Sequence, residues 1–134
     1  MDTSCVQTLE DQCTGQAYIL SNKNDGENSI IIVGGANQAY QVDPGTQSGL
    51  KLEWEQAIQN SDVLLLQLEI PQWVNKAAAI LAKNCNSLVI LDLGGKNEAL
   101  DVDILKYVDF LSPNETEIKK IFDMNNEKLT QIFH

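Results

Sequence analysis

The sequence predicts an α/β fold, a partial doubly wound parallel sheet with helices on both faces and a small β-hairpin near the N-terminus. Three short runs, at 63–68, 88–93 and 108–111, are apolar without the alternation of a half-exposed strand. Continuous apolar runs of this length are typical of strands that are buried on both faces. Segments with helical spacing separate the runs, which predicts parallel strands joined by right-handed crossovers.

The N-terminal part is predicted to form the hairpin. Two strand-like runs, Thr14–Leu20 and Asn28–Val33, are separated by a polar stretch that contains the turn pair Asp25-Gly26. The small residues at 34–37 then allow a close approach of the backbone to another segment. We expect one domain over 1–134, with the hairpin at about 13–37 and the α/β portion at about 49–134.

Helices are predicted between and after the apolar runs. Leu52–Asn60 has helical spacing, and Pro71 suits the first turn of a helix in which Val74, Ala77, Ala78 and Leu81 share one face. A short helical piece is expected at 103–107, a helix from Asn114 to about Phe122, and a last one at 127–133.

Length and composition limit the class of protein. The chain has 134 residues, of which 43% are hydrophobic and 21% charged, as in a soluble globular domain. Its longest apolar runs, Val63–Leu66 and Ala77–Ala82, are far shorter than the ~20 residues that cross a bilayer. No basic segment followed by an apolar stretch opens the chain. We therefore expect a cytoplasmic protein with no membrane partner.

The charge of the chain argues against nucleic-acid binding. Nine lysines and no arginine stand against 19 acidic residues, for a formal charge of −10. A surface this acidic repels a phosphate backbone, and without arginine the bidentate grip on phosphate is lost. An anion site here would need helix N-termini, lysines or Mg²⁺.

The cysteines and the single histidine exclude several kinds of site. Cys5, Cys13 and Cys85 are widely spaced and form no Cys-x-x-Cys pair, and His134 is the last residue. Neither a four-ligand zinc site nor a disulfide framework is supported, which suits a reducing cytosol. A catalytic triad with histidine within this chain is equally unsupported.

Polar side chains follow each predicted strand. Glu69 comes after the first run, Asp92 closes the second, and Asn114 and Glu117 follow the third. Parallel strands bring their carboxyl ends to one edge of the sheet, where ligands of α/β proteins bind. Carboxylates accept hydrogen bonds from sugar hydroxyls and bind Mg²⁺ directly or through water. This edge therefore suits a polyhydroxylated substrate together with a metal-bound phosphate.

Each of these residues also has a purely structural interpretation. Glu69 can be a solvated residue that leaves a strand, as most glutamates are exposed. Asn114 and Glu117 have the spacing of a capping box, with Asn at the N-cap and Glu three positions later. The capping and ligand-binding interpretations are compatible.

Four strings in order resemble the ribokinases, which are PfkB-type carbohydrate kinases. Residues 14–19 (TGQAYI) and 26–37 (GENSIIIVGGAN) resemble their lid, 67–71 (QLEIP) their Gln-Leu-Glu-x-Pro strand end, and 112–117 (SPNETE) their Pro-Asn-Glu-x-Glu segment. Together the matches cover nearly the whole chain. Residues 92–95 (DLGG) depart from the Asn-Pro-Ala-Pro of bacterial ribokinases and are closer to plant versions.

The resemblance implies ATP-dependent phosphorylation of D-ribose at its 5-hydroxyl. By this match Glu69 accepts hydrogen bonds from ribose hydroxyls, and Ala17 and Ile19 line the sugar pocket from the lid. Asn114 would contact ATP, and Glu117 would organise Mg²⁺ through water. The full-length enzyme would be a homodimer that pairs through the lid, with a monovalent cation such as K⁺ as a further cofactor.

Two segments of the family have no match in these residues. They are the early sugar-binding segment and the late Gly-Ala-Gly-Asp motif with the aspartate that accepts the hydroxyl proton. The resemblance therefore implies a central fragment that holds no catalytic residue and is inactive alone. Two alternatives stay open: another PfkB-type sugar or nucleoside kinase, or a non-catalytic binding or interaction module derived from one.

Overall fold

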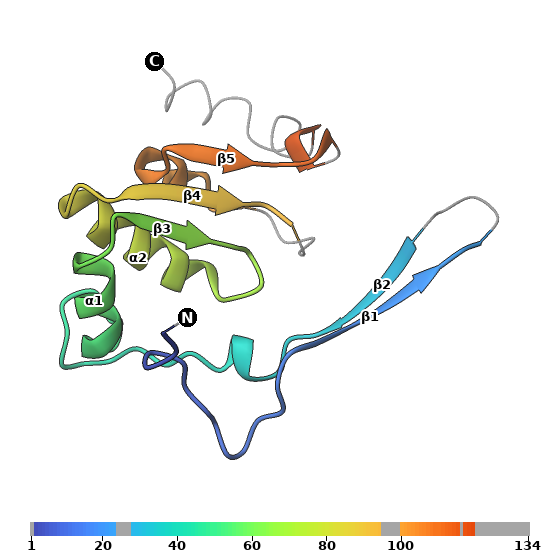
Figure 1. Cartoon of the computed structure of the whole chain (residues 1–134), viewed down its shortest axis with the longest axis horizontal. Helices are drawn as coiled ribbons and strands as arrows, with labels where there is room; N and C mark the ends of the chain where they lie inside the picture. Colours follow the sequence, from blue (N-terminus) through green and yellow to red (C-terminus); the bar gives the residue numbers. More distant parts are fainter. Residues whose placement is uncertain (1, 24–27, 95–99, 116, 120–134) are drawn as a thin grey trace.

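A computed structural model describes residues 2–23, 28–94, 100–115 and 117–119 of the chain. It has a three-stranded α/β part and a two-stranded ribbon that projects away from it (Figure 1). The described elements are, in order, β1 (Gln16–Ser21), β2 (Asn28–Val33), the 3₁₀ helix η1 (Gly35–Gln38), α1 (Leu52–Gln59), β3 (Val63–Leu66), α2 (Gln72–Asn84), β4 (Leu88–Asp92), the 3₁₀ helix η2 (Val102–Tyr107) and β5 (Phe110–Ser112). The predicted α/β class is confirmed.

The sheet of the α/β part is parallel, in the strand order β3-β4-β5. Leu66 lies opposite Leu91, and Asp92 lies opposite Ser112. The three strands point the same way in Figure 1, so their carboxyl ends share one edge. This is the arrangement that the sequence predicts.

Helix α2 covers one face of the sheet through a side rich in small residues. Its buried residues are Val74, Asn75, Ala78, Ala79 and Ala82, and the apolar ones pack in one cluster with Leu66, Val89 and Leu91. The alanines let the helix approach the strands closely, and each fully buried Val or Leu contributes about 1.5–3 kcal/mol. The buried side of α2 differs by about one residue position from the side that the sequence predicts. Ala77 and Leu81, which are predicted to be buried, are half-buried, whereas Asn75 is fully buried.

The opposite face of the sheet is uncovered by the described residues. Leu65 on β3 is 72% exposed and Phe110 on β5 is 59% exposed. When three parallel strands lie in chain order, right-handed crossovers place both connections on the same face. The sequence predicts helices on both faces of the sheet. The described segments between the strands cover only one of these faces.

Some predicted boundaries differ from the structure. The first apolar run leaves the sheet at Leu66, since Leu68 and Glu69 form a turn. The third strand begins at Phe110, because the amide of Val108 ends η2 by donating to the carbonyl of Leu105. Helical residues begin at Glu115, but residues 116 and 120–122 of the predicted helix lie outside the described residues, as do the predicted helix at 127–133 and the Asp25-Gly26 turn. Among the described residues, no helix has the length and apolarity needed to cross a membrane.

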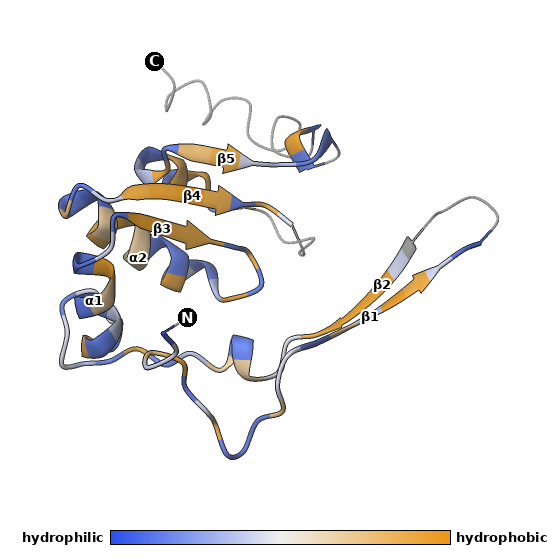
Figure 2. Cartoon of the chain, viewed as in Figure 1, coloured by the Kyte–Doolittle hydropathy of each residue, from blue (hydrophilic) through white to orange (hydrophobic). Residues whose placement is uncertain are grey.

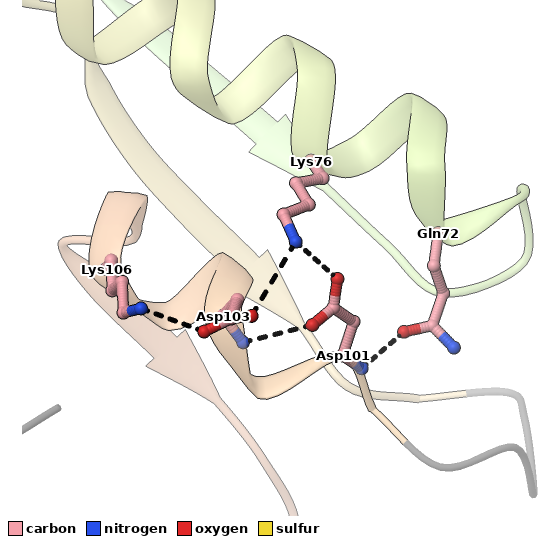
Figure 3. A network of polar contacts seen from close by, with 5 residues as sticks. All are labelled: Gln72, Lys76, Asp101, Asp103 and Lys106. Carbon is pink, nitrogen blue, oxygen red and sulfur yellow. Dashed lines mark hydrogen bonds and ion pairs between the residues drawn. The ribbon is translucent and has the colours of Figure 1, made fainter. Parts of the chain in front are cut away.

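An ion-pair network joins α2 to η2 (Figure 3). The ammonium of Lys76 lies 2.7 Å from Asp101 and 3.9 Å from Asp103, and Lys106 lies 2.8 Å from Asp103. The Gln72 side-chain oxygen accepts a hydrogen bond from the backbone amide of Asp101. Exposed ion pairs add little stability individually. Their effect here is to hold the segment after β4 against the first turns of α2.

Asp109 joins three elements at the amino ends of the strands. Its carboxylate accepts hydrogen bonds from the ammonium of Lys83 on α2, at 2.6 Å, and from the backbone amide of Val89 on β4, at 2.8 Å. The Lys83 ammonium, followed by the Val89 amide, holds the pKa of Asp109 below its usual value of 3.8. Both partners favour the charged form of this carboxyl in the folded state.

We predict that Asp109→Asn lowers the melting temperature of the chain at neutral pH. Because the folded pKa of Asp109 is depressed, its contribution is fully present above the unfolded value and is lost as pH falls through the folded value. Thermal melts followed by circular dichroism should show the difference between the two proteins shrinking below pH 3.8.

Asp62→Asn is the matched control, because Asp62 is exposed and precedes β3 as Asp109 precedes β5. It should melt like the unmodified chain. Equal melting temperatures of the Asp109 variant and the unmodified chain at neutral pH would contradict the prediction.

Candidate functional site

Glu69 lies in the turn that directly follows β3, at the carboxyl edge of the sheet. The residue as a whole is half-buried, and its Oε2 is buried without a hydrogen-bond partner. The solvated interpretation of Glu69 does not fit this oxygen, although part of the residue is exposed. A buried polar atom without a partner costs about 1–3 kcal/mol, more when it is charged, so this oxygen is an unsatisfied acceptor.

Two side-chain amides bind the backbone of this turn. Asn75 Nδ2 on α2 donates to the carbonyl oxygen of Gln67 at 2.6 Å, and Gln38 Nε2 at the end of η1 donates to the carbonyl oxygen of Glu69. Sequence reasoning missed both residues. The available signal was Asn75 itself, a polar residue between Val74 and Ala78 on the apolar side of a helix.

The other two strand ends hold polar groups that are engaged locally. Asp92, the exposed last residue of β4, accepts a hydrogen bond from the backbone amide of Gly94 at 2.8 Å. Asn114 follows β5 by two residues. The sheet thus places Glu69, Asp92 and Asn114 at neighbouring strand ends of one edge.

Asn114 and Glu117 form the predicted capping box. The backbone amide of Glu117 donates to Asn114 Oδ1 at 2.9 Å, and the backbone and side-chain amides of Asn114 each donate to one Glu117 carboxylate oxygen at 2.8 Å. Each carboxylate oxygen keeps a further lone pair after this bond. The structural interpretation is confirmed, and it leaves Glu117 able to accept from a ligand or from metal-bound water.

The described residues do not form a ready-made metal cage. In the part of the chain that the structure describes, no group of three or more His, Cys, Asp or Glu side chains is arranged to hold a metal ion. Mg²⁺ is commonly held by one or two carboxylates together with waters and substrate phosphates. A single carboxylate at Glu117, already hydrogen-bonded, fits a contact made through metal-bound water.

The β1–β2 ribbon is apolar on both of its faces (Figure 2). Ala17 pairs with Ile32 and Ile19 with Ile30 on one face, while Tyr18 pairs with Ile31 on the other. Ile19 is 61% exposed, and Ala17 is also exposed. The ribbon stands beyond the carboxyl ends of the sheet strands (Figure 1).

The base of the ribbon is a tight crossing of two backbone segments. Gly35 has φ +52°, and a Cβ added there would lie 2.3 Å from the carbonyl oxygen of Cys13. The next amide, that of Ala36, donates to the same oxygen at 2.8 Å. The close approach that the small residues predict is therefore the approach of one end of the ribbon to the other.

A cavity of about 720 Å³ lies away from the strand ends. It is enclosed by the N-terminal segment, the segment after η1, and apolar side chains of α1 and α2 that include Trp54 and Val74. Its lysine is already engaged, since the Lys51 ammonium lies 5.6 Å from the Trp54 ring centre and donates to Gln7 Oε1. The buried, unpartnered carboxylate oxygen of Glu69 lies instead at a strand end, where we place the candidate site.

We predict that Gly35→Ala loosens the base of the ribbon. A side chain at positive φ is strained by roughly 1–2 kcal/mol, and here it also meets a carbonyl oxygen. Hydrogen exchange at the amide of Ala36 should become faster, because this amide bonds Cys13 across the crossing. Gly45→Ala is the control, as its added Cβ meets only the Asp43 side chain at 3.2 Å. Unchanged exchange at Ala36 in the Gly35 variant would show that the crossing tolerates a side chain.

Comparison with known proteins assigns the family. The sequence model described as pfkB family carbohydrate kinase matches residues 1–134. Ribokinase of Arabidopsis thaliana is 36% identical over 127 residues, and ribokinase of Haemophilus influenzae is 31% identical over 140 residues. These alignments cover 95% and 100% of this chain but only 32% and 43% of the two relatives.

A solved structure agrees with the sequence matches. Arabidopsis thaliana ribokinase complexed with ribose and ATP has a TM-score of 0.70 and 35% identity to this chain. The similarity covers 98% of this chain and 42% of that structure. The chain thus spans less than half the length of these relatives, and it belongs to the pfkB family of carbohydrate kinases.

Proposed function

We propose that this chain forms the ribose-facing and phosphate-facing part of a ribokinase, which transfers the terminal phosphate of ATP to the 5-hydroxyl of D-ribose. The curated relatives named above are ribokinases, and the Arabidopsis structure contains ribose and ATP. The observation that carries the proposal is the buried, unpartnered Oε2 of Glu69 at the carboxyl edge of the sheet. A sugar hydroxyl is a donor that would satisfy this oxygen.

The two parts of the chain have different roles in this proposal. Glu69 accepts hydrogen bonds from ribose hydroxyls at the strand end. Ala17 and Ile19 supply an apolar surface from the β1–β2 ribbon, which acts as a lid over the sugar. Both residues are exposed in the structure, so this contact requires the ribbon to come closer to the sheet edge.

The capping box would organise the phosphate end of the site. Asn114 contributes an amide toward ATP, and Glu117 holds ordered water around Mg²⁺ with its remaining lone pairs. When bound, Mg²⁺ neutralises charge on the phosphates during transfer. Phosphoryl transfer depends mainly on position and charge, so an amide and a carboxylate held rigidly by each other suit this task. We also propose a monovalent cation such as K⁺ as a further cofactor of the full-length enzyme.

The residue that accepts the hydroxyl proton is not assigned among these residues. Glu69, Asn114 and Glu117 bind and position, and we expect the isolated chain to show no turnover. The tests therefore measure binding. They also separate ribose from fructose and adenosine, the ligands expected of other sugar and nucleoside kinases of the family.

We predict that Glu69→Gln weakens the binding of D-ribose by roughly tenfold or more, because hydrogen bonds to a charged group contribute about 1.5–3 kcal/mol. Titration calorimetry with millimolar ribose measures this. Glu10→Gln is the matched control, since Glu10 is an exposed glutamate of the N-terminal segment. Its ribose affinity should equal that of the unmodified chain.

Three results would contradict the assignment in different ways. Equal ribose affinity of the Glu69 variant and the unmodified chain would remove Glu69 from the site. Tighter binding of fructose or adenosine than of ribose would favour another kinase of the family. The absence of any sugar or nucleoside binding would favour a non-catalytic module.

We also propose that the complete protein is a homodimer that pairs through the ribbon. A two-stranded ribbon is at best marginally stable alone in water, and this one exposes apolar side chains on both faces. One face would cover the sugar through Ala17 and Ile19. The other, with Tyr18 and Ile31, would pack on the ribbon of a second copy.

Ile31→Lys should shift the complete protein from dimer to monomer in sedimentation experiments, because it places a charge at the centre of this apolar face. Val6→Lys is the control, since Val6 is also exposed but lies in the N-terminal segment. Val6→Lys should sediment like the unmodified chain. A dimer that persists in the Ile31 variant at the same concentration would rule out pairing through this face.

A further inference from the structure

The turn that carries Glu69 is held by hydrogen bonds to two of its backbone carbonyls. Gln67 and Glu69 lie beyond Leu66, the last residue of β3, where strand pairing has ended. Backbone carbonyls at such a place need another donor, and here both donors are side-chain amides. Between them, the buried side chain of Leu68 anchors the turn in the core. The peptide groups on either side of Leu68 are therefore fixed from two directions.

Asn75 holds the turn from the core side. It is fully buried on α2, and its Nδ2 donates to the Gln67 carbonyl at 2.6 Å. Its Oδ1 is buried without a partner. Burying a polar side chain among apolar neighbours is unfavourable unless it is hydrogen-bonded, so what Asn75 adds is its donor.

Gln38 holds the turn from the ribbon side. It is the last residue of η1, which begins at Gly35 in the crossing at the ribbon base. Its Nε2 donates to the carbonyl oxygen of Glu69 itself. The backbone of Glu69 is thereby joined to the segment from which the ribbon projects (Figure 1).

We propose that Gln38 and Asn75 are positioning residues that set the backbone of Glu69 for sugar binding, and that Gln38 links the ribbon base to this site. The proposal rests on the proposed function for the role of Glu69. Asn75 fixes the peptide that follows Gln67, and Gln38 fixes the peptide that follows Glu69. A movement of the ribbon base is transmitted to the Glu69 carbonyl through one hydrogen bond.

The test is Gln38→Met, which keeps the length of the side chain and removes its donor. Gln38 is exposed, so the variant should fold like the unmodified chain. The carbonyl of Glu69 shares a peptide with the amide of Ile70, so the ¹⁵N resonance of Ile70 should move while that of Leu68 stays. The affinity for D-ribose should fall roughly tenfold, as small misplacements in a site weaken its contacts strongly.

Asn75→Ala, which removes the donor without adding volume beside Ala78 and Ala79, should give the reciprocal spectrum, moving the resonance of Leu68 and leaving that of Ile70. Gln41→Met is the control for the loss of a glutamine, because Gln41 is exposed three residues after Gln38. It should leave both resonances and the ribose affinity unchanged.

An unchanged Ile70 resonance in Gln38→Met, or a ribose affinity equal to that of the unmodified chain, overturns the role of Gln38. If the unmodified chain itself binds no ribose, the proposed function fails separately. The Ile70 and Leu68 resonances then decide whether the two amides hold the turn.

Discussion

The packing of α2 on β3 and β4 positions the turn that carries Glu69 at the edge of the sheet. The small side chains of Ala78, Ala79 and Ala82 let the helix lie close to the strands, where it buries Leu66 and Leu91. The same helix begins just after Pro71, only two residues beyond Glu69. Any shift of the helix along the sheet would therefore displace the turn that carries Glu69.

Asn75 shows how this packing and the candidate site are connected. It occupies the same buried side of α2 as the alanines, but its amide binds the Gln67 carbonyl instead of adding apolar contact. At the other end of the turn, Gln38 connects Glu69 to the base of the ribbon. The site thus combines a support from the core with a hydrogen bond to the segment at the base of the ribbon.

Two apolar surfaces remain exposed in the described chain, and they have different physical origins. The outer face of the sheet, with Leu65 and Phe110, is exposed because right-handed crossovers place the described connections on the other side. The ribbon, with Tyr18 and Ile31, is exposed because a two-stranded sheet has nothing of its own to cover either face. Large exposed apolar surfaces of this kind are typical of interfaces.

The sequence predicts the parallel sheet well, because continuous apolar runs and the helical spacing after Pro71 leave few alternatives. The capping box was also predictable, since Asn114 and Glu117 are local in sequence. The roles of Gln38 and Asn75 were not, because each depends on a contact with a backbone carbonyl whose position only the folded chain defines. A prediction from apolar spacing treats Asn75 as a surface residue. The predicted buried side of α2 therefore differs from the observed side by about one residue position.

The most direct test of this account is to map the chemical-shift changes that D-ribose causes in the amides of the isotopically labelled chain. We expect the largest changes at Gln67–Ile70 and at Gln38. The competing location is the cavity of about 720 Å³ beside the N-terminal segment. Changes that gather around Lys51 and Trp54, with none at the strand end, would contradict the account.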